Sequence, residues 1–373
     1  MPAEPPQPSQ LTEGQILNAL RPIVDPDFNR SIVDLGFVKD IEIEAGRVAF
    51  KIELTTPACP VKEQFREAAQ TAVRRLEGVT GVDVTMTANT RGRGASSSGD
   101  GETEILPDVR NVIAVASGKG GVGKSTVASN LALALAQTGA EVGLLDCDIY
   151  GPSIPLMLAT HGEPSVTPER KIIPKQGYGI KLMSIGFLAG DNAPVIWRGP
   201  MVHGVIRQFL TDVLWGELDY LVLDLPPGTG DAVLTLTQTA PLSGAVIVTT
   251  PQEVALIDAR KGLKMFQRVN VPVLGIVENM SGFICPNCDV RHPIFGEGGG
   301  SRAAEDLGVP LLGQIPLQPE VVDAGDSGQP LVTSAPESVA GRAFRDLAGE
   351  IARGLSIRNA DPAPALHEIV WKG

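Results

Sequence analysis

The stretch whose residue types are best suited to chemistry runs from Ser117 to Thr126 and reads Ser-Gly-Lys-Gly-Gly-Val-Gly-Lys-Ser-Thr. It contains the pattern G-x-x-x-x-G-K-[ST] from Gly118 to Ser125, which is typical of loops that bind nucleotide phosphates. An apolar run at 111–116 precedes it and predicts a buried parallel strand. A run rich in Ala and Leu at 127–137 follows it and predicts a helix. The loop therefore has the flanking elements that a chance match would lack.

The chemistry of this loop follows from its backbone and from two side chains. Gly120, Gly121 and Gly123 allow the chain to approach phosphates closely and to present N–H groups to them. The N-terminus of the following helix adds partial positive charge. Lys124 is expected to reach the β- and γ-phosphates, and the Ser125 hydroxyl to bind Mg²⁺. The predicted nucleotide-binding residues of the loop are Gly118, Lys119, Gly120, Gly121, Val122, Gly123, Lys124, Ser125 and Thr126.

Acidic residues follow two other apolar segments that predict parallel strands. Asp146 and Asp148 follow one of these segments, and Asp224 follows the other. Because open α/β sheets bind ligands beyond the carboxyl ends of their strands, we expect these carboxylates to lie near the loop. We assign Asp224 to Mg²⁺, and Asp146 to the support of Mg²⁺ or of its own loop. The alternative is that an aspartate here caps a helix, an interpretation that suits Asp231 best.

Two cysteines, Cys285 and Cys288, form a C-x-x-C pair in a predicted loop. Two thiolates can hold one edge of a metal centre, but a cluster or a structural zinc ion usually takes four ligands. The sequence has no second C-x-x-C, so a two-fold dimer could supply the missing pair. Three alternatives stay open: a redox dithiol, a bare turn, and a zinc site completed by His292 and a ligand from elsewhere.

The other two cysteines are Cys59 and Cys147. Cys59 stands between a predicted strand and a predicted helix, where a thiol would be nucleophilic or metal-binding, or would simply pack the turn. Cys147 lies between Asp146 and Asp148, and the favoured interpretation is a small residue packed near them.

The composition limits the class of protein. A chain of 373 residues can form two domains with separate cores, and 43% hydrophobic residues is normal for a soluble globular protein. The N-terminus lacks a basic segment followed by an apolar core, and no apolar run reaches the roughly 18–20 residues of a membrane span. A net charge of −12 argues against a general nucleic-acid binder. We therefore predict a cytoplasmic protein without nucleic-acid or membrane partners, whose cysteines are reduced or bind metal.

The chain divides into regions of different pattern. Residues 1–90 alternate as a small α+β domain, with helices at 11–20 and 61–76. Residues 91–106 are rich in Gly, Ser and Arg and predict a flexible linker. From 107 to 357 strands and helices alternate, which predicts an α/β fold with a mostly parallel sheet flanked by helices. The tail at 358–373 shows no interpretable pattern.

Lys119 directly follows the first glycine of the loop, and this placement resembles the deviant Walker A motif of the ParA/MinD/nitrogenase-iron-protein ATPases. The resemblance implies a sandwich dimer in which Lys119 reaches across to the ATP of the partner chain. It also implies that Asp148 activates the attacking water, that Asn279 recognises adenine, and that Pro316 lies in the loop flanking the adenine. The alternative for Lys119 is a solvated surface lysine.

A wider set of residues resembles the Mrp/ApbC iron–sulfur cluster carriers. The resemblance rests on the phosphate-binding loop and on 146–155, 224–231, 278–281 and the C-x-x-C pair, and the small N-terminal domain is similar to the SufT/PaaD type. It implies a homodimer that holds a labile [4Fe–4S] cluster at its interface and hydrolyses ATP slowly. Apo iron–sulfur client proteins and cluster-assembly scaffolds are the implied partners. Residues around 292–296 depart from the expected pattern, which puts only the local loop shape in doubt.

Two rival functions remain open at this point. A positioning ATPase of the MinD/ParA kind would need an amphipathic membrane helix or a basic DNA-binding surface, and 365–372 is too short and too weakly basic for the former. An electron-transfer ATPase like the nitrogenase iron protein uses separated cysteines rather than a C-x-x-C pair.

Overall fold

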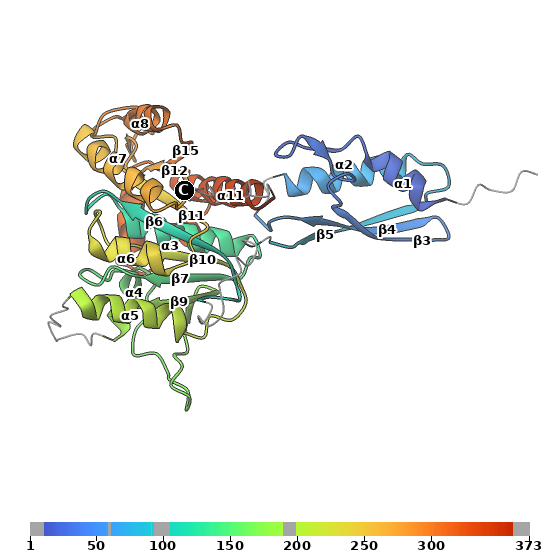
Figure 1. Cartoon of the computed structure of the whole chain (residues 1–373). Helices are drawn as coiled ribbons and strands as arrows, with labels where there is room; N and C mark the ends of the chain where they lie inside the picture. Colours follow the sequence, from blue (N-terminus) through green and yellow to red (C-terminus); the bar gives the residue numbers. More distant parts are fainter. Residues whose placement is uncertain (1–10, 59–60, 91, 93–104, 189–198, 361–373) are drawn as a thin grey trace, which may run out of the picture. The chain divides into compact units, whose positions relative to one another are not determined.

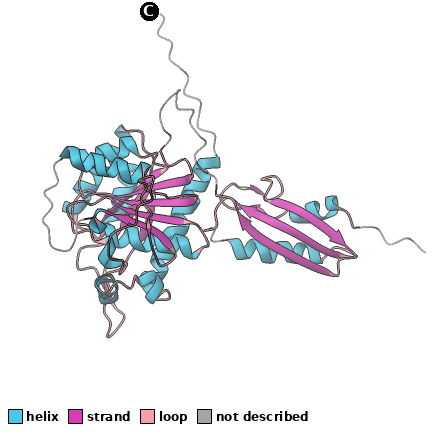
Figure 2. Cartoon of the chain, turned by 90° about the horizontal axis from the view of Figure 1, so that it is seen from below, coloured by secondary structure: helices cyan, strands magenta, loops and turns pink. Residues whose placement is uncertain are grey.

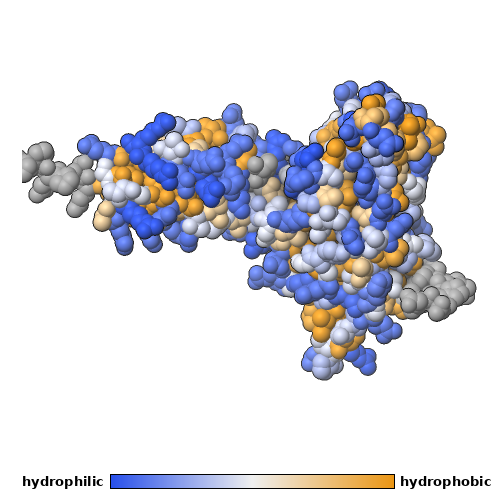
Figure 3. Space-filling view, turned by 180° about the vertical axis from the view of Figure 1, so that it is seen from behind, coloured by the Kyte–Doolittle hydropathy of each residue, from blue (hydrophilic) through white to orange (hydrophobic). Residues whose placement is uncertain are grey.

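The computed structural model describes residues 11–58, 61–90, 92, 105–188 and 199–360, with the side chains of 199–203 left out (Figure 1). The chain divides into two compact units, Met1–Arg91 with Ser356–Gly373 and Gly92–Leu355. Cys59, most of the predicted linker and the tail after Ala360 lie outside the described residues. On the face seen in Figure 3, hydrophilic and apolar residues are mixed over each unit.

The smaller unit contains a three-stranded sheet in the order β3-β4-β5, in which β3 and β4 are antiparallel and β4 and β5 are parallel. Helix α1 begins after Thr12, whose side chain forms a capping box with Gln15. Alternate residues of β4 are buried, as a sheet with one face on the core requires. The elements of this unit are α1 Glu13–Leu20, β1 Val24–Asp25, β2 Arg30–Ser31, β3 Val38–Glu44, β4 Arg47–Leu54, α2 Lys62–Arg74 and β5 Gly81–Ala88.

The larger unit is built on an eight-stranded sheet in the order β15-β12-β11-β6-β10-β7-β9-β8. All neighbouring strands are parallel except the edge pair β8 and β9. The predicted α/β class with a mostly parallel sheet is therefore confirmed. The strands are β6 Val109–Ser117, β7 Val142–Asp146, β8 Lys175–Gly177, β9 Ile180–Ser184, β10 Leu218–Asp224, β11 Gly244–Thr249, β12 Val273–Glu278 and β15 Leu311–Gln314.

Helices lie on both faces of this sheet, as Figure 2 shows for the cyan helices around the magenta strands. The strands in the middle of the sheet are buried on both faces, which explains why they consist of continuous apolar runs. The helices are α3 Lys124–Gln137, α4 Ile154–Met157, η1 Ile185–Phe187, α5 Gly199–Thr211, α6 Asp231–Thr239, α7 Glu253–Arg268, α8 Gly299–Leu307, α9 Pro319–Asp326, α10 Leu331–Ser334 and α11 Val339–Ala360.

A small hairpin formed by β13 Phe283–Ile284 and β14 Arg291–His292 stands apart from the main sheet. The sequence predicted a plain loop here, because strands of two residues are too short to show an alternating pattern. Within the described ranges, no helix has both the length and the apolar stretch that crossing a bilayer requires.

Candidate functional site

The phosphate-binding loop joins the end of β6 to the start of α3, with Gly123 as the N-cap of the helix. Gly121 and Gly123 both have φ of +80°, a conformation that residues with a side chain rarely adopt. A Cβ added at Gly120 or Gly121 would meet nothing within 4 Å, so the loop borders open space on that side. A Cβ at Gly118 would lie 2.2 Å from the backbone carbon of Asp258, so this glycine allows α7 to pack against the loop.

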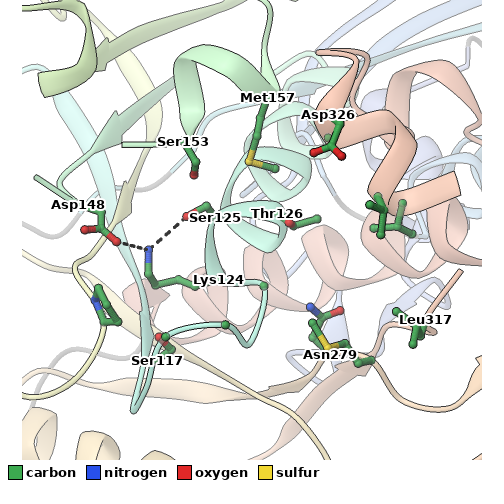
Figure 4. A pocket seen from close by; sticks show the side chains of 18 of the residues that line it. Ser117, Lys124, Ser125, Thr126, Asp148, Ser153, Met157, Asn279, Leu317 and Asp326 are labelled. Carbon is green, nitrogen blue, oxygen red and sulfur yellow. Dashed lines mark hydrogen bonds and ion pairs between the residues drawn. The ribbon is translucent and has the colours of Figure 1, made fainter. Parts of the chain in front are cut away.

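A cavity of about 410 Å³ opens beside the loop. Figure 4 shows Lys124, Ser125 and Thr126 on one side of it, with Asn279 and Leu317 beyond them. The predicted site residues that line the cavity are Lys119, Gly120, Gly121, Gly123, Lys124, Ser125, Thr126, Asp148, Asn279 and Pro316. The others, which do not line it, are Gly118, Val122, Asp146, Asp224, Cys285 and Cys288.

Lys124 is buried and its ammonium group contacts two acidic residues. Its Nζ lies 2.6 Å from Oδ1 of Asp224 and 4.0 Å from Oδ2 of Asp148, and the lysine side chain is only 6% exposed. Nζ also lies 3.4 Å from Oγ of Ser125 (Figure 4). A buried charge is tolerated when it is paired, so these carboxylates hold the lysine at the mouth of the loop.

Asp224 has one oxygen to spare for a metal ion. Its Oδ1 accepts from Lys124, whereas its buried Oδ2 has no hydrogen-bond partner within the described part of the chain. A buried carboxylate oxygen without a donor fits a hard cation or the water bound to it. With the Ser125 hydroxyl nearby, the residues present therefore fit a Mg²⁺–nucleotide complex.

Asp146 lies beside Asp224, because the two residues pair in register on β7 and β10. Its carboxylate accepts hydrogen bonds from Ser184 Oγ at 2.9 Å and from the Asp148 N–H at 3.0 Å. Burial, with the nearby Asp224 carboxylate, raises the pKa of Asp146 to about 8. Burial likewise raises the pKa of Asp224, against the opposing effect of Lys124. Two acids and one lysine thus share a water-poor site.

Cys147 is 1% exposed, and its Sγ lies 3.8 Å from the Leu145 carbonyl oxygen. Burial raises the pKa of this thiol well above its ordinary value. A protonated, enclosed thiol packs as a small apolar group, in agreement with the favoured interpretation of this residue.

Lys119 and Asn279 border the cavity from different elements. The Lys119 side chain makes no hydrogen bond or ion pair with any residue that the structure describes, so it is available to a ligand. The Asn279 side chain donates from Nδ2 to the Val122 carbonyl oxygen at 2.9 Å. It therefore holds the phosphate-binding loop in place, while the catalytic and adenine-binding roles of these residues remain predictions.

The cysteine pair lies at the turn of the β13–β14 hairpin. The Cys285 N–H donates to the Val290 carbonyl at 3.1 Å, and the Asp289 N–H donates to the Cys285 carbonyl at 2.9 Å. Cys285 is partly buried and Cys288 is exposed. The Asn287 N–H, with the Cys288 thiol, lowers the pKa of Cys285, which favours a metal-binding thiolate.

The zinc alternative receives no support from this hairpin. Among the described residues, no three His, Cys, Asp or Glu side chains converge as a metal ion would require. In the part of the chain that the structure describes, Cys285, Cys288 and His292 are thus not brought together as three ligands of one ion.

Sequence reasoning missed one wall of the nucleotide cavity. This wall comes from the short helices α4 and α9, which contribute Leu156, Met157, Val321, Val322, Gly325 and Asp326. These residues are mostly apolar and lie far apart in the chain, so no motif marks them. Only the short amphipathic runs of α4 and α9 could have suggested that these helices pack against another element.

The parallel sheet, the glycine-rich turn between strand and helix, and the buried lysine beside Asp224 together define a P-loop NTPase. The chain belongs to the family described as NUBPL iron-transfer P-loop NTPase, which matches residues 108–352. A second family, described as iron–sulfur cluster assembly protein, matches residues 13–84.

Relatives over nearly the whole length agree with this assignment. An iron–sulfur cluster carrier protein of Synechocystis sp. is 51% identical over 358 residues, which is 93% of this chain and 99% of that protein. A protein of the same description from Deinococcus radiodurans is 46% identical over 94% of this chain and 97% of its own. The predicted resemblance to the iron–sulfur cluster carriers is confirmed.

A solved structure is similar to the larger unit. The nucleotide-binding protein of Archaeoglobus fulgidus in complex with ADP has a TM-score of 0.54 and 45% identity, and the match covers 60% of this chain and 88% of that one. The P-loop NTPase fold is confirmed by this similarity.

Proposed function

We propose that this protein is an ATP-dependent iron–sulfur cluster carrier of the cytoplasm. Two chains form a homodimer that holds a labile [4Fe–4S] cluster, hydrolyse ATP slowly, receive the cluster from an assembly scaffold and transfer it to apo-proteins. The observation that carries this proposal is the pair of thiols, one partly buried and one exposed, on a hairpin that directly follows the segment lining the nucleotide cavity.

The nucleotide half of the proposal rests on the charges around Lys124. Its ammonium group now contacts Asp224, and the phosphates of ATP offer it a second anionic partner in the adjacent cavity. Movement of the lysine toward the phosphates would leave the Asp224 carboxylate, with the Ser125 hydroxyl, to hold Mg²⁺. When bound, Mg²⁺ neutralises phosphate charge and orients the γ-phosphate.

Two further residues take roles in hydrolysis. Asp148 lies at the cavity wall with its side chain 14% exposed, where it orients the attacking water and accepts its proton. Lys119 extends into the cavity region without an internal partner among the described residues, which suits a contact to the nucleotide of a second chain. The dimer therefore serves catalysis as well as cluster binding.

The cluster half rests on the number of ligands. One hairpin offers two thiolates, a [4Fe–4S] cluster takes four cysteines, and a two-fold axis brings two hairpins together. The cluster is cargo in this scheme rather than a permanent cofactor. The exposure of Cys288 suits transfer, because an acceptor thiol has to reach the cluster for exchange of ligands.

The test is anaerobic loading of the full chain with iron and sulfide. We expect about one cluster per two chains, since each chain provides half of the ligands. Cys285→Ser and Cys288→Ser should each lose the bound sulfide and the dimer that depends on it, and both should still bind ATP. Cys147→Ala is the matched control, because it changes a buried cysteine away from the hairpin. Unchanged sulfide content in both hairpin variants would reject the proposal.

A further inference from the structure

A short connecting segment, residues 278–284, joins the nucleotide cavity to the cysteine hairpin. It begins at the end of β12 and ends with β13, immediately before Cys285. Asn279 and Met280 line the cavity at the start of the segment. The same few residues thus border a nucleotide at one end and carry a metal-binding thiol at the other.

The backbone of the connecting segment is held against the other lining of the cavity. The Ser281 N–H donates to the Ile315 carbonyl at 2.8 Å, and the Leu317 N–H donates to the Gly282 carbonyl at 2.9 Å. The Ile284 N–H donates to the Leu317 carbonyl at 3.2 Å. Leu317 also lines the cavity. A ligand that displaces residues 279–280 or Leu317 would therefore move the start of the hairpin.

Glu278, the first residue of the connecting segment, is completely buried and anchors the segment. Its carboxylate accepts from Ser281 Oγ at 2.6 Å, from the Gly300 N–H at 2.5 Å and from Gln314 Nε2 at 2.8 Å. Three donors and the N-terminal end of α8 stabilise the buried charge. The carboxylate therefore fixes the direction of the Ser281 hydroxyl, whose proton it accepts in hydrogen bonding.

Arg291 returns from the far strand of the hairpin to the same serine. Its Nη2 lies 2.5 Å from the Ser281 carbonyl oxygen and 2.7 Å from Ser281 Oγ. The side chain passes over Gly282, where an added Cβ would lie 2.5 Å from Arg291 Nε. The glycine, which has φ of +76°, leaves the space that this arginine occupies.

We propose that Arg291 is a positioning residue that couples nucleotide occupancy to the placement of Cys285 and Cys288; this inference deepens the proposed function and rests on it. The path runs from the cavity residue Asn279 through Ser281, oriented by Glu278, to Arg291 on β14. Hairpins with strands of two residues have marginal stability by themselves. The arginine is therefore needed for β14 to move together with the connecting segment. Without it, the C-x-x-C turn would move independently of the nucleotide.

The test measures the two thiols directly in cluster-free full-length protein. The rate of alkylation of each hairpin cysteine is followed by mass spectrometry with and without ADP, and modification of the buried Cys147 would reveal a general opening of the structure. In the unmodified protein we expect ADP to change the rates at the hairpin by about five-fold or more, in the usual range for coupled sites. In Arg291→Met the change should fall below about two-fold, and Arg291→Lys, which keeps the positive charge on a single donor nitrogen, should be intermediate.

Arg302→Met is the matched control, because Arg302 is an exposed arginine at α8 whose side chain donates only to the Glu297 carbonyl among described residues. It should retain the full effect of ADP. An ADP effect in Arg291→Met equal to that of the unmodified protein, or no effect in the unmodified protein, would overturn the coupling. If Arg291→Met does not unfold cooperatively, Arg291→Lys takes its place, and an ADP effect equal to that of the unmodified protein would then overturn the coupling.

Failure of the coupling and failure of the proposed function give different results. Alkylation is measured without iron or sulfide, whereas the carrier function is tested by sulfide content. A protein that binds the cluster but shows no ADP effect loses only the coupling, and one that shows the effect but binds no sulfide loses only the carrier function.

Discussion

The nucleotide end and the cysteine hairpin of the larger unit are built in opposite ways. At the nucleotide end, Lys124, Asp146 and Asp224 are at most 6% exposed and project from or beside central strands of the sheet. At the hairpin, two-residue strands present Cys288 to solvent. One region is charged and enclosed, and the other is small and open.

By our proposal, this difference follows from what each region binds. Phosphates and Mg²⁺ are held best by groups whose positions are set beforehand in a water-poor site, because no energy is then needed to reorganise them. A cargo that has to leave again requires thiols that another protein can reach. A single chain contains the phosphate-binding loop and its acidic residues, and by our proposal a second chain adds Lys119 to the first site and two of the four thiolates to the second.

Lys124→Met gives the largest effect expected at the nucleotide end. The substitution removes the cation that faces the phosphates, so ATP turnover should fall by about 100-fold or more. Alkylation of the hairpin cysteines without nucleotide should remain unchanged, which would sharpen the contrast between the two regions. Lys261→Met, at an exposed position on α7, is the control. Turnover that stays within about ten-fold of the unmodified protein would contradict the role of this lysine.

Asp146→Asn tests whether the nucleotide end is as enclosed as its geometry indicates. The pKa of Asp146 is raised to about 8 from 3.8, so between these values the folded state keeps a proton that the unfolded state has lost. Raising the pH through this window therefore destabilises the unmodified protein, whereas the asparagine variant lacks the titrating group. As the pH rises through this window, the free energy of unfolding of the variant minus that of the unmodified protein should increase by up to about 1.4 kcal/mol per pH unit.

Urea unfolding at pH 5, 6 and 7 measures this slope, with Asp323→Asn at an exposed position on α9 as the control. The effect should level off above the raised pKa and disappear at acid pH. Parallel stability curves for the protein and the Asp146→Asn variant would mean that the carboxyl group is hydrated rather than enclosed.

Sequence patterns identified the nucleotide end well, because several local signals coincide there. The apolar run at 111–116 lies inside β6, and the last two residues of the loop motif, Lys124 and Ser125, are the first two residues of α3. Parallel strands buried on both faces require continuous apolar runs, so each central strand was visible as such. Asp146 and Asp224, the last residues of β7 and β10, could then be placed at the carboxyl edge of the sheet by topology alone.

The hairpin and its attachment could not be predicted in the same way. The hydrogen bonds that join Arg291, Ser281 and Glu278 depend on a chain reversal. Strands of two residues are too short to predict this reversal from the sequence pattern. The cavity wall from α4 and α9 depends on packing between segments far apart in the sequence. A hydrophobic periodicity or a sequence motif indicates local structure, whereas these contacts form only when the whole unit folds.

Cys147→Ala gives the smallest effect and separates the two kinds of cysteine. Cys147 is enclosed beside the acidic pair, and burial raises the pKa of its thiol, so it remains protonated and is a poor metal ligand. Loss of the buried sulfur should lower the free energy of unfolding by about 1 kcal/mol through a small cavity. Cluster loading and ADP binding should not change, whereas Cys288→Ala should alter loading with a stability change within about 0.5 kcal/mol. Lost sulfide in Cys147→Ala would assign this thiol to the cluster site, and the two regions would then no longer be chemically separate.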